Sequence, residues 1–324
     1  MRAMMATQWG EPSNLRLTEL PDPQPGPRQV AIDVRASACN FFDILMVQGK
    51  YQVRPPLPFS PGGEVAGVVR AVGPGVDRIA PGDRVFAMLG WGGFASMALA
   101  PMDSVFKMPD SMSFEHGAAF GVVYQTSYVG LLDRAQLRAG ETLLVHAAAG
   151  GVGLAAVQIG RALGARVLAT AGSSAKLEVA REHGAEEAYD YTTPDWVERV
   201  KAATGGRGAD VVYDPVGGDI FDLSTKCIAF GGRLLVIGFA SGRIPSIQVN
   251  RILLKNIAVV GLHWGAYRQH DPARIPQAMD ALFDLYTHGK LHPVVSSTWP
   301  LGQAASALEE IASRRSIGKV LLLP

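Results

Sequence analysis

Residues 143–153 read LLVHAAAGGVG, and the segment GLAAVQIGRALGA follows from residue 153 to residue 165. An apolar run that passes through small residues into a helical pattern predicts a strand, a tight turn and a helix. Residues 148–153 align with the dinucleotide fingerprint G-x-G-x-x-G, with alanine in place of the first glycine. Such a turn brings the backbone and the helix N-terminus close to a pyrophosphate. The candidate cofactor-binding residues of the turn are therefore Gly150, Gly151, Val152 and Gly153.

The residues about twenty positions after this turn indicate which dinucleotide is bound. Enzymes that bind NAD keep an acidic residue here for the ribose hydroxyls. This chain reads AGSSAK from Ala171 to Lys176, so the acid is missing and a lysine is close by. This pairing favours NADP(H) over NAD(H).

The composition describes a globular chain without an obvious large partner. The 324 residues are 48% hydrophobic and 18% charged, with a formal net charge of +1. This length suggests one large domain or two, and the charge gives no general attraction to nucleic acid or acidic membranes. Cys39 and Cys227 make a poor disulfide framework, and no apolar run approaches the ~20 residues that span a bilayer. We expect a cytoplasmic protein with no membrane partner, for which nucleic acid is an improbable ligand.

The texture of the sequence changes along the chain. The first 110 residues combine Pro- and Gly-rich turns with short apolar runs, which is typical of a small β-barrel-like domain. Six strand-like segments then alternate with helical ones, and their near-continuous apolar character predicts a parallel sheet covered on both faces. We expect a doubly wound dinucleotide-binding domain at residues 121–262. Too few elements follow for a third domain, so residues 263–324 are expected to complete a discontinuous domain with residues 1–120.

A series of motifs recurs in a characteristic order. They are Asn40-x-x-Asp43, PGGEVAGVVRAVGPGV from 61, PGDRVFA from 81, HAAAGGVG from 146, TGGRGADVVYDPVGG from 204, GGRLLVIGFASG from 231 and IGKVLLL from 317. Over essentially its whole length the chain resembles the zinc-free quinone oxidoreductase (zeta-crystallin-like) branch of the medium-chain dehydrogenase/reductase superfamily. The resemblance implies an α/β protein with a Rossmann domain that binds NADPH and a discontinuous GroES-like β-barrel catalytic domain. It also implies a homodimer joined through the edge strand IAVVGL at 257–262.

The chain departs from the zinc-dependent members of that superfamily. Those proteins have a cysteine where Asn40 stands and a Gly-His-Glu where Gly62, Gly63 and Glu64 stand. Their structural zinc lobe needs four clustered cysteines, whereas Cys39 lies one place out of register and only one other cysteine occurs. We therefore expect no metal site.

The resemblance assigns further residues to the cofactor. Ser173, Lys176 and Tyr191 match positions around the 2′-phosphate, where a lysine charge and hydroxyl groups suit a dianion. Arg314 matches a position that reaches this phosphate in some relatives, although it or Arg315 could equally be the solvated end of a helix. The remaining matches are Thr126, near the nicotinamide amide, and Gly238 and Phe239, at the carboxyl edge of the fifth strand.

Three residues of the N-terminal segment match positions near the substrate. Asn40 could hydrogen-bond a substrate carbonyl or hold a water molecule. For Asp43 a helix-capping role is nearly as well supported as a catalytic one. Tyr51 resembles a tyrosine that lines the quinone site of relatives. The Trp264–Tyr267 segment is interpreted as a pocket wall, a dimer surface or a structural aromatic cluster.

The reaction that these matches imply is metal-free hydride transfer from NADPH to a small-molecule quinone. The same residues would also serve reduction of an α,β-unsaturated carbonyl such as an enone, an enal or an enoyl thioester. A more distant alternative is a non-enzymatic crystallin-like protein that binds NADPH or RNA. The near-neutral charge and the lack of a basic stripe argue against RNA.

Overall fold

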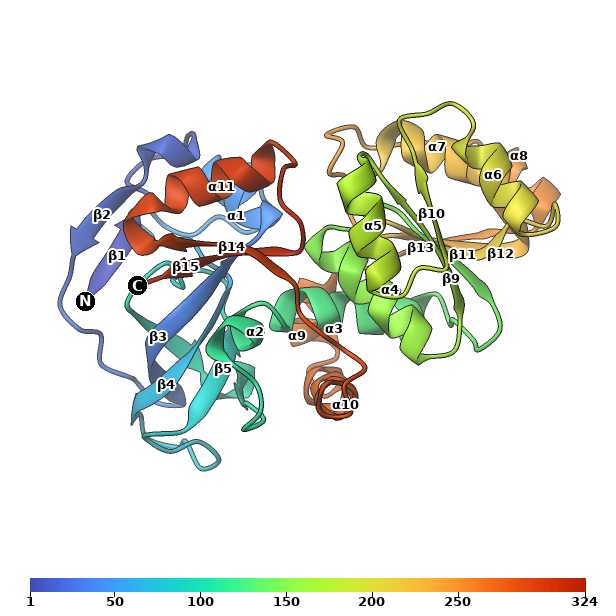
Figure 1. Cartoon of the computed structure of the whole chain (residues 1–324). Coiled ribbons are helices and arrows are strands. Elements are labelled where there is room, and N and C mark those ends of the chain that lie inside the picture. The colour runs from blue at the N-terminus through green and yellow to red at the C-terminus, as the bar shows by residue number, and fades with distance from the viewer. The chain divides into compact units, whose positions relative to one another are not determined.

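Two compact units make up the chain, of which the computed structural model describes residues 1–324. Unit 1 comprises residues 1–122 and 293–324, and unit 2 comprises residues 123–292. The blue N-terminal strands and the red C-terminal elements accordingly share one unit in Figure 1. The discontinuity agrees with the sequence analysis, but the chain returns to unit 1 at residue 293 rather than 263.

The segment 263–292 groups with unit 2 because helix α10 (Arg274–Thr287) is bonded to that unit. The Arg274 guanidinium pairs with both carboxylate oxygens of Asp133 at 2.6 and 2.9 Å. Gln125 donates to the carbonyl of Ile275 at 3.4 Å, and the Gln158 amide both donates to and accepts from the backbone of His292. An amphipathic helix at this point of the sequence could cover either domain. In the structure, its buried apolar face (Ile275, Met279 and Leu282) and these polar partners hold it in unit 2.

Unit 2 is built on a six-stranded parallel sheet in the order β10-β9-β8-β11-β12-β13. This order reverses at β8, as in a doubly wound fold. The strands are β8 (Thr142–Val145), β9 (Arg166–Ala171), β10 (Glu187–Asp190), β11 (Ala209–Asp214), β12 (Ile228–Val236) and β13 (Ala258–Gly261). The helices are α3 (Gly121–Val129, which begins at the unit boundary), α4 (Gly151–Ala162), α5 (Ser174–Glu182), α6 (Trp196–Ala203), α7 (Gly218–Cys227), α8 (Val249–Lys255), α9 (Tyr267–His270) and α10.

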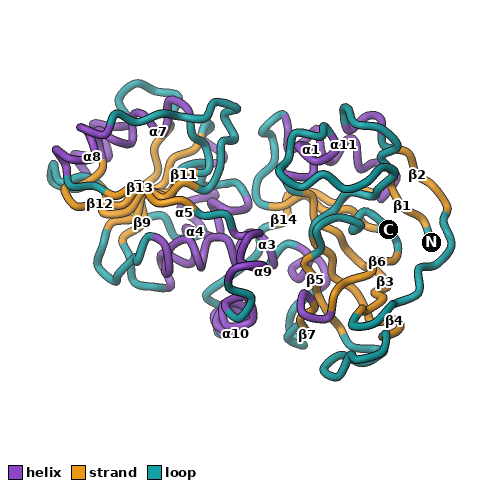
Figure 2. Tube along the Cα trace, turned by 180° about the vertical axis from the view of Figure 1, so that it is seen from behind, coloured by secondary structure: helices purple, strands orange, loops and turns teal.

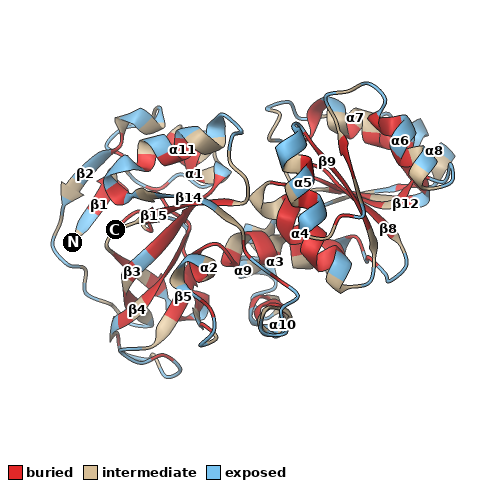
Figure 3. Cartoon of the chain, viewed as in Figure 1, coloured by how far each residue is buried: buried red, intermediate tan, exposed pale blue.

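Helices cover both faces of this sheet. Figures 1 and 2 show α7 and α8 on one side and α3 and α4 on the other. Leu144 faces the first side, where it joins a buried cluster with Trp196 and Phe221. The neighbouring Leu143 contacts α4 on the second side, close to Gly160. Burial on both faces explains why β8 reads as an unbroken apolar run, and Figure 3 shows the buried strands.

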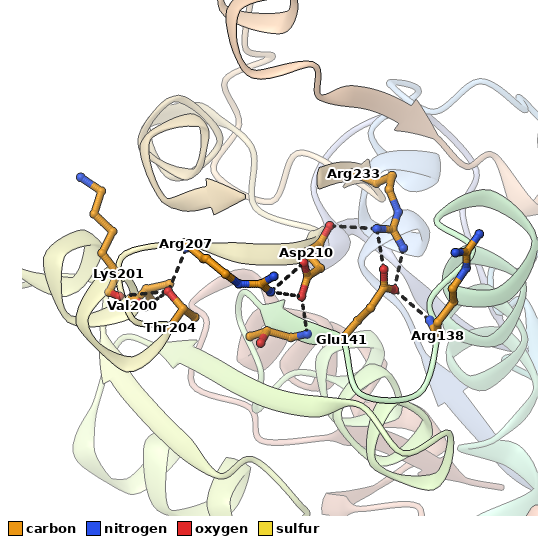
Figure 4. Close-up of polar contacts among 10 residues, drawn as sticks. Arg138, Glu141, Val200, Lys201, Thr204, Arg207, Asp210 and Arg233 are labelled. Carbon is orange, nitrogen blue, oxygen red and sulfur yellow. Dashed lines mark hydrogen bonds and ion pairs between the residues drawn. The ribbon is translucent and has the colours of Figure 1, made fainter. Parts of the chain in front are cut away.

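Ion pairs and hydrogen bonds connect β8, β11 and β12 near their amino ends, at the edge of the sheet opposite the phosphate turn. The Arg233 guanidinium on β12 binds both carboxylate oxygens of Glu141, which precedes β8, at 2.9 and 2.7 Å. Asp210 on β11 accepts from the backbone N–H of Thr142 at 2.8 Å and pairs with Arg207 (Figure 4). The registers of β8, β11 and β12 are thereby fixed together.

Unit 1 contains a seven-stranded sheet along the path β14-β15-β3-β4-β5-β7, with β6 also paired to β3, and a separate β1–β2 pair. The strands are β1 (Arg2–Met5), β2 (Arg16–Glu19), β3 (Gln29–Cys39), β4 (Glu64–Val72), β5 (Arg84–Met88), β6 (Met97–Pro101), β7 (Val105–Lys107), β14 (Val295–Pro300) and β15 (Lys319–Leu323). The helices are α1 (Phe41–Val47), α2 (Phe114–Ala118) and α11 (Ala304–Ala312). The C-terminal β15 pairs antiparallel with β3, with Val320 opposite Cys39, so the last residues of the chain lie beside its first candidate substrate-site residue.

No helix in either unit combines the length and the apolar character needed to cross a bilayer.

Candidate active site

The phosphate turn of unit 2 is held by backbone bonds to both neighbouring strands. The N–H of His146 donates to the carbonyl of Tyr213 on β11, and the N–H of Ala148 donates to the carbonyl of Thr170 on β9, both at 3.0 Å. A Cβ on Gly153 would lie 2.3 Å from the carbonyl oxygen of Ala147, so this position accepts no side chain. Gly150 precedes α4, whose first N–H groups have no partner within the helix. The turn therefore has the tight shape and the donor groups that an anion needs.

Helix α3 is tied to this turn through a buried pair of hydroxyl groups. Ser127 donates to the carbonyl of Val152 at 2.9 Å, and its oxygen lies 2.9 Å from the hydroxyl of Tyr213. Burial raises the pKa of Tyr213, so its hydroxyl stays protonated and can donate to Ser127. Thr126, the residue before Ser127, lies on this same helix α3.

Ser173, Lys176 and Tyr191 gather at the carboxyl ends of β9 and β10. The N–H of Tyr191 donates to the carbonyl of Ala171 at 3.2 Å, and its ring lies 3.2 Å from where a Cβ of Gly172 would be. Ser173 is exposed at the N-cap of α5, where its side chain makes no capping bond. Lys176 lies in the first turn of the same helix. The structure thus brings together the three residues assigned to the 2′-phosphate.

Gly238 and Phe239 follow β12 at the same edge of the sheet. Phe239 is 38% exposed, and its ring lies 3.0 Å from where a Cβ of Gly217 would be. Asp214, at the end of β11, is buried and accepts from the backbone N–H groups of Val216 and Gly217 at 2.8 and 3.0 Å. Asp214 therefore shapes the loop that carries the Phe239 contact, and burial raises the pKa of its carboxyl.

In unit 1, Asn40 and Asp43 open helix α1. Asp43 is fully buried and accepts from the backbone N–H of Asn40 at 2.8 Å and from that of Gly62 at 3.1 Å. Burial raises the pKa of Asp43 to about 7, while these two donors and Lys319 act in the opposite direction. Both oxygens are taken by the protein backbone, so the geometry favours the capping interpretation of Asp43 over the catalytic one.

The Asn40 side chain belongs to a buried ionic cluster formed by Asn40, Glu64 and Lys319. The ammonium of Lys319 lies 2.7 Å from Glu64 Oε1 and 2.6 Å from Asn40 Oδ1. Asn40 Nδ2 donates to the same Glu64 oxygen at 3.0 Å, and Glu64 Oε2 accepts from the backbone N–H of Val122 at 2.8 Å. The side chains of Lys319 and Glu64 are 5% and 0% exposed.

Comparison with known proteins places the chain in a family. The model of the alcohol dehydrogenase GroES-like domain matches residues 26–110, and that of the zinc-binding dehydrogenase domain matches residues 151–284. A quinone oxidoreductase-like protein 2 homolog of Nematostella vectensis is 40% identical, over 99% of this chain and 88% of that protein. The quinone oxidoreductase of Rattus norvegicus is 34% identical, over 100% and 98%. The structure of Escherichia coli quinone oxidoreductase complexed with NADPH superposes with a TM-score of 0.92, at 32% identity and with both chains fully covered.

The chain is a medium-chain dehydrogenase/reductase of the quinone oxidoreductase branch. It is an oxidoreductase of that superfamily, and the Rossmann domain with a discontinuous GroES-like domain expected from its sequence is confirmed.

For the remaining predicted residues of this oxidoreductase, the structure gives the local surroundings and not the proposed role. Tyr51 is half-buried and stacks on Phe42, with ring centroids 5.6 Å apart. Arg314 lies in unit 1 just after α11, with a φ of 57°, and its reach to the phosphate stays a prediction. The rings of Trp264 and Tyr267 lie 4.9 Å apart in unit 2 and form a local aromatic pair.

Sequence reasoning missed two functional candidates in this oxidoreductase, the carboxylate of Glu64 and the ammonium of Lys319. Each had a visible signal, because each is a charged residue that begins an otherwise apolar run, EVAGVV and KVLLL. Lysine and glutamate are almost never fully buried without a partner. Two opposite charges in apolar strands were therefore candidates for pairing with each other.

Proposed function

We propose that the chain is an NADPH-dependent quinone reductase that transfers hydride without a metal ion. The observation that carries the proposal is the group of Ser173, Lys176 and Tyr191 at the carboxyl ends of β9 and β10, where no acid follows β9. A lysine and a hydroxyl there suit a 2′-phosphate, whereas a ribose diol is held by an acid. The solved relatives described as complexes with NADPH support the same cofactor.

The residues of unit 2 have separate roles in this proposal. The N-terminal amides of α4 hold the pyrophosphate, and Lys176 with Ser173 holds the 2′-phosphate. Thr126 contacts the nicotinamide amide. NADPH, when bound, supplies a hydride equivalent from its nicotinamide ring. The protein contributes orientation and a shielded, fixed set of hydrogen-bond donors.

The residues of unit 1 act on the acceptor. Asn40 offers an amide N–H to a carbonyl oxygen on which negative charge develops. Burial raises the pKa of the Tyr51 hydroxyl, with the Asp43 carboxylate adding to the effect, so Tyr51 stays protonated at neutral pH and can donate a hydrogen bond. A quinone spreads the developing charge over a stabilised anion and needs little further help. An enone makes the same demand on the Asn40 donor through its enolate oxygen.

The zinc that one family model's description implies does not fit these residues. A Cβ on Gly63 would lie 2.3 Å from the Phe42 ring, so Phe42 occupies the space of a histidine at this position. Cys39 is packed in an apolar cluster, and Glu64 is paired with Lys319. No three His, Cys, Asp or Glu side chains of the chain lie close enough together to hold a metal ion. This donor set supports a metal-independent reaction.

Steady-state NADPH oxidation with four acceptors tests the proposal. The acceptors are 1,4-benzoquinone, 9,10-phenanthrenequinone, an enone and crotonyl-CoA, compared at equal enzyme concentration. We expect the quinones to give the highest kcat/KM, and chelator treatment to leave the rate unchanged. Faster turnover of the enone or of crotonyl-CoA would replace the quinone with that substrate class. Tight NADPH binding with no turnover of any acceptor would overturn the enzymatic proposal.

Lys176→Ala tests the cofactor assignment separately. We expect NADPH binding to weaken by about 1.5–3 kcal/mol, the range for hydrogen bonds to charged groups, with little change for NADH. The matched control is Lys201→Ala, since Lys201 lies on α6 of the same unit and pairs only with the exposed Glu198 among the acids. Equal losses for both cofactors would contradict the assignment of Lys176 to the 2′-phosphate.

We further propose a homodimer that uses the β13 edge of the sheet. β13 is the last strand of the sheet and pairs with β12 alone, so one of its edges offers unpaired backbone groups. The adjoining α8 has no buried residue, and Val249, Leu253 and Leu254 on it are 78%, 72% and 71% exposed. Light scattering should give twice the 34.4 kDa mass of one chain. A monomer mass at micromolar concentration would contradict this assembly.

A further inference from the structure

We propose that Lys319 is a positioning residue that fixes the Asn40 amide with its N–H, rather than its carbonyl, available to the acceptor. This inference rests on the proposed function for the role of Asn40. It concerns a residue at the far C-terminal end of the chain, 279 positions from Asn40. The two residues meet because β15 pairs with β3, so that Lys319 begins its strand where β3 ends.

The partners of Asn40 determine which way its amide points. An ammonium group has only donors and a carboxylate has only acceptors. Lys319 Nζ, at 2.6 Å, therefore requires the amide oxygen on its side, and Glu64 Oε1, at 3.0 Å, requires the amide nitrogen on the other. Flipping the amide would place its oxygen against the carboxylate and its N–H groups against the ammonium. Two buried repulsions would result.

In this arrangement the second N–H of the Asn40 amide is its most weakly held group. One N–H of Nδ2 is used by Glu64, and the other has only a long, 3.4 Å contact with the carbonyl of Ala38. The residue as a whole is 7% exposed, so the amide lies in surroundings from which water is largely excluded. The group that Asn40 can offer is thus a donor, which is what a carbonyl oxygen gaining negative charge requires.

The charge of Lys319 also strengthens that donor. A cation bound to the amide oxygen polarises the amide, and hydrogen bonds in a chain reinforce one another where water is excluded. Lys319 and Glu64 neutralise each other, and Glu64 is further held by the backbone N–H of Val122. The cluster therefore places an internal cation behind Asn40 without leaving an unpaired charge.

A purely structural role would be to join β15 to β4, and the test must separate the two roles. The informative variant is the double substitution Lys319→Met with Glu64→Gln. It removes both charges, keeps similar side-chain volumes and leaves an oxygen on residue 64 for Val122. Replacing a buried ion pair by neutral groups of similar size is often neutral for stability. Lys107→Met is the matched control, because the Lys107–Asp83 pair of the same unit is on the surface.

In steady-state kinetics we expect the double variant to fold and to bind NADPH like the wild type. Its kcat should fall by about tenfold to a hundredfold, the scale for a misplaced catalytic contact, with KM for NADPH unchanged. The single variant Lys319→Arg, which keeps the cation beside Glu64, should lose less kcat than the double variant. Lys107→Met should lose none. A folded double variant with the kcat of the wild type would overturn the proposal.

A readout that does not need turnover completes the test. With ¹⁵N-labelled asparagine, the side-chain NH₂ signals of Asn40, assigned by their loss in Asn40→Asp, should show slow hydrogen exchange in the wild type. In the folded double variant they should shift and exchange faster, while Lys107→Met leaves them in place. Unchanged signals in the double variant would overturn the positioning role. If the wild type reduces none of the acceptors, the proposed function fails, but these signals still decide whether Lys319 fixes Asn40.

Discussion

The two units contain different kinds of buried side-chain cluster. Unit 1 encloses the charged pair of Lys319 and Glu64 with Asn40, whereas unit 2 encloses the neutral side chain of His146. His146 Nδ1 lies 2.7 Å from the Thr170 hydroxyl, and Nε2 lies 2.8 Å from that of Ser224. Because Ser224 donates its own proton to Ile220, it accepts from Nε2–H, and Nδ1 accepts from Thr170.

The difference separates two ways of building a site. In unit 1, side-chain charges determine how the candidate substrate-site amide is presented. In unit 2, the backbone and uncharged groups determine the shape of the phosphate turn. Burial lowers the pKa of His146, at the start of the turn, to about 3, so its ring is neutral. In the proposed cofactor site, a phosphate would meet backbone amides and partly exposed cations rather than a buried charge.

Breaking the charged centre should have the largest effect on stability. In Glu64→Ala the Lys319 ammonium is left buried without its counter-charge, and we expect a loss of about 3–5 kcal/mol in the free energy of unfolding. Urea denaturation measures it. Glu178→Ala is the control, because the Glu178–Arg181 pair is exposed and should contribute below about 1 kcal/mol. Equal losses in the two variants would mean that the buried pair is no more important than a surface one.

Altering the turn of unit 2 tests whether backbone shape, without charge, carries a comparable share. Gly153→Ala places a methyl group 2.3 Å from the Ala147 carbonyl, and moving the backbone should cost about 1–3 kcal/mol of stability. NADPH binding, measured by fluorescence titration, should weaken with it. Gly150→Ala is the matched control for the stability measurement, since its Cβ meets the same oxygen only at 3.3 Å. Similar behaviour of the two alanine variants would refute the packing argument.

The sequence predicted the shape of unit 2 better than the polar centre of unit 1. The apolar runs of β8 and β12 and the glycine pattern at 148–153 are local signals, so the parallel sheet and its turn could be derived from them. The pairing of Lys319 with Glu64 spans 255 residues and exists only because β15 returns to β3. No local pattern encodes that return.

The packing of α10 and the role of Asp43 also depend on contacts between residues far apart in the sequence. The segment after residue 262 forms an amphipathic helix, α10, which either domain could bury. In the structure its apolar face is buried and Arg274 pairs with Asp133 of unit 2. From the sequence, a capping role for Asp43 is nearly as well supported as a catalytic one. Its second partner, the N–H of Gly62, lies in a loop 19 residues away and is what favours capping.

Changing pH should separate the neutral centre from the charged one. The unfolded chain protonates His146 near its ordinary pKa of 6.5, but the folded chain does so only near 3. The unfolded state therefore binds more protons in this window, and the stability due to His146 is present above about pH 6.5 and is lost as the pH falls toward 3.

The variant His146→Gln isolates this effect. At pH 7.5 we expect it to be less stable than the wild type by about 1–2 kcal/mol, because two buried hydrogen bonds are rearranged. The gap should shrink by up to about 1.4 kcal/mol for each pH unit below 6.5. Urea denaturation at pH 7.5, 6.0 and 5.0 measures it. A gap that stays constant with pH would show that His146 is not held neutral in the folded chain.

The smallest effect on stability is expected for the surface ion pair of Arg207 and Asp210 in unit 2. Arg207 pairs with Asp210 at 3.1 Å, but the side chain of Arg207 is 68% exposed (Figure 4). We expect Arg207→Ala to cost less than about 1 kcal/mol and the difference to vanish in 1 M NaCl, since solvent and salt screen such a pair. Glu64→Ala should keep its larger deficit in the same salt, because ions do not reach a buried pair. If 1 M NaCl abolished both deficits, the Lys319–Glu64 pair would be accessible to solvent. Unit 1 would then not contain a buried charged pair.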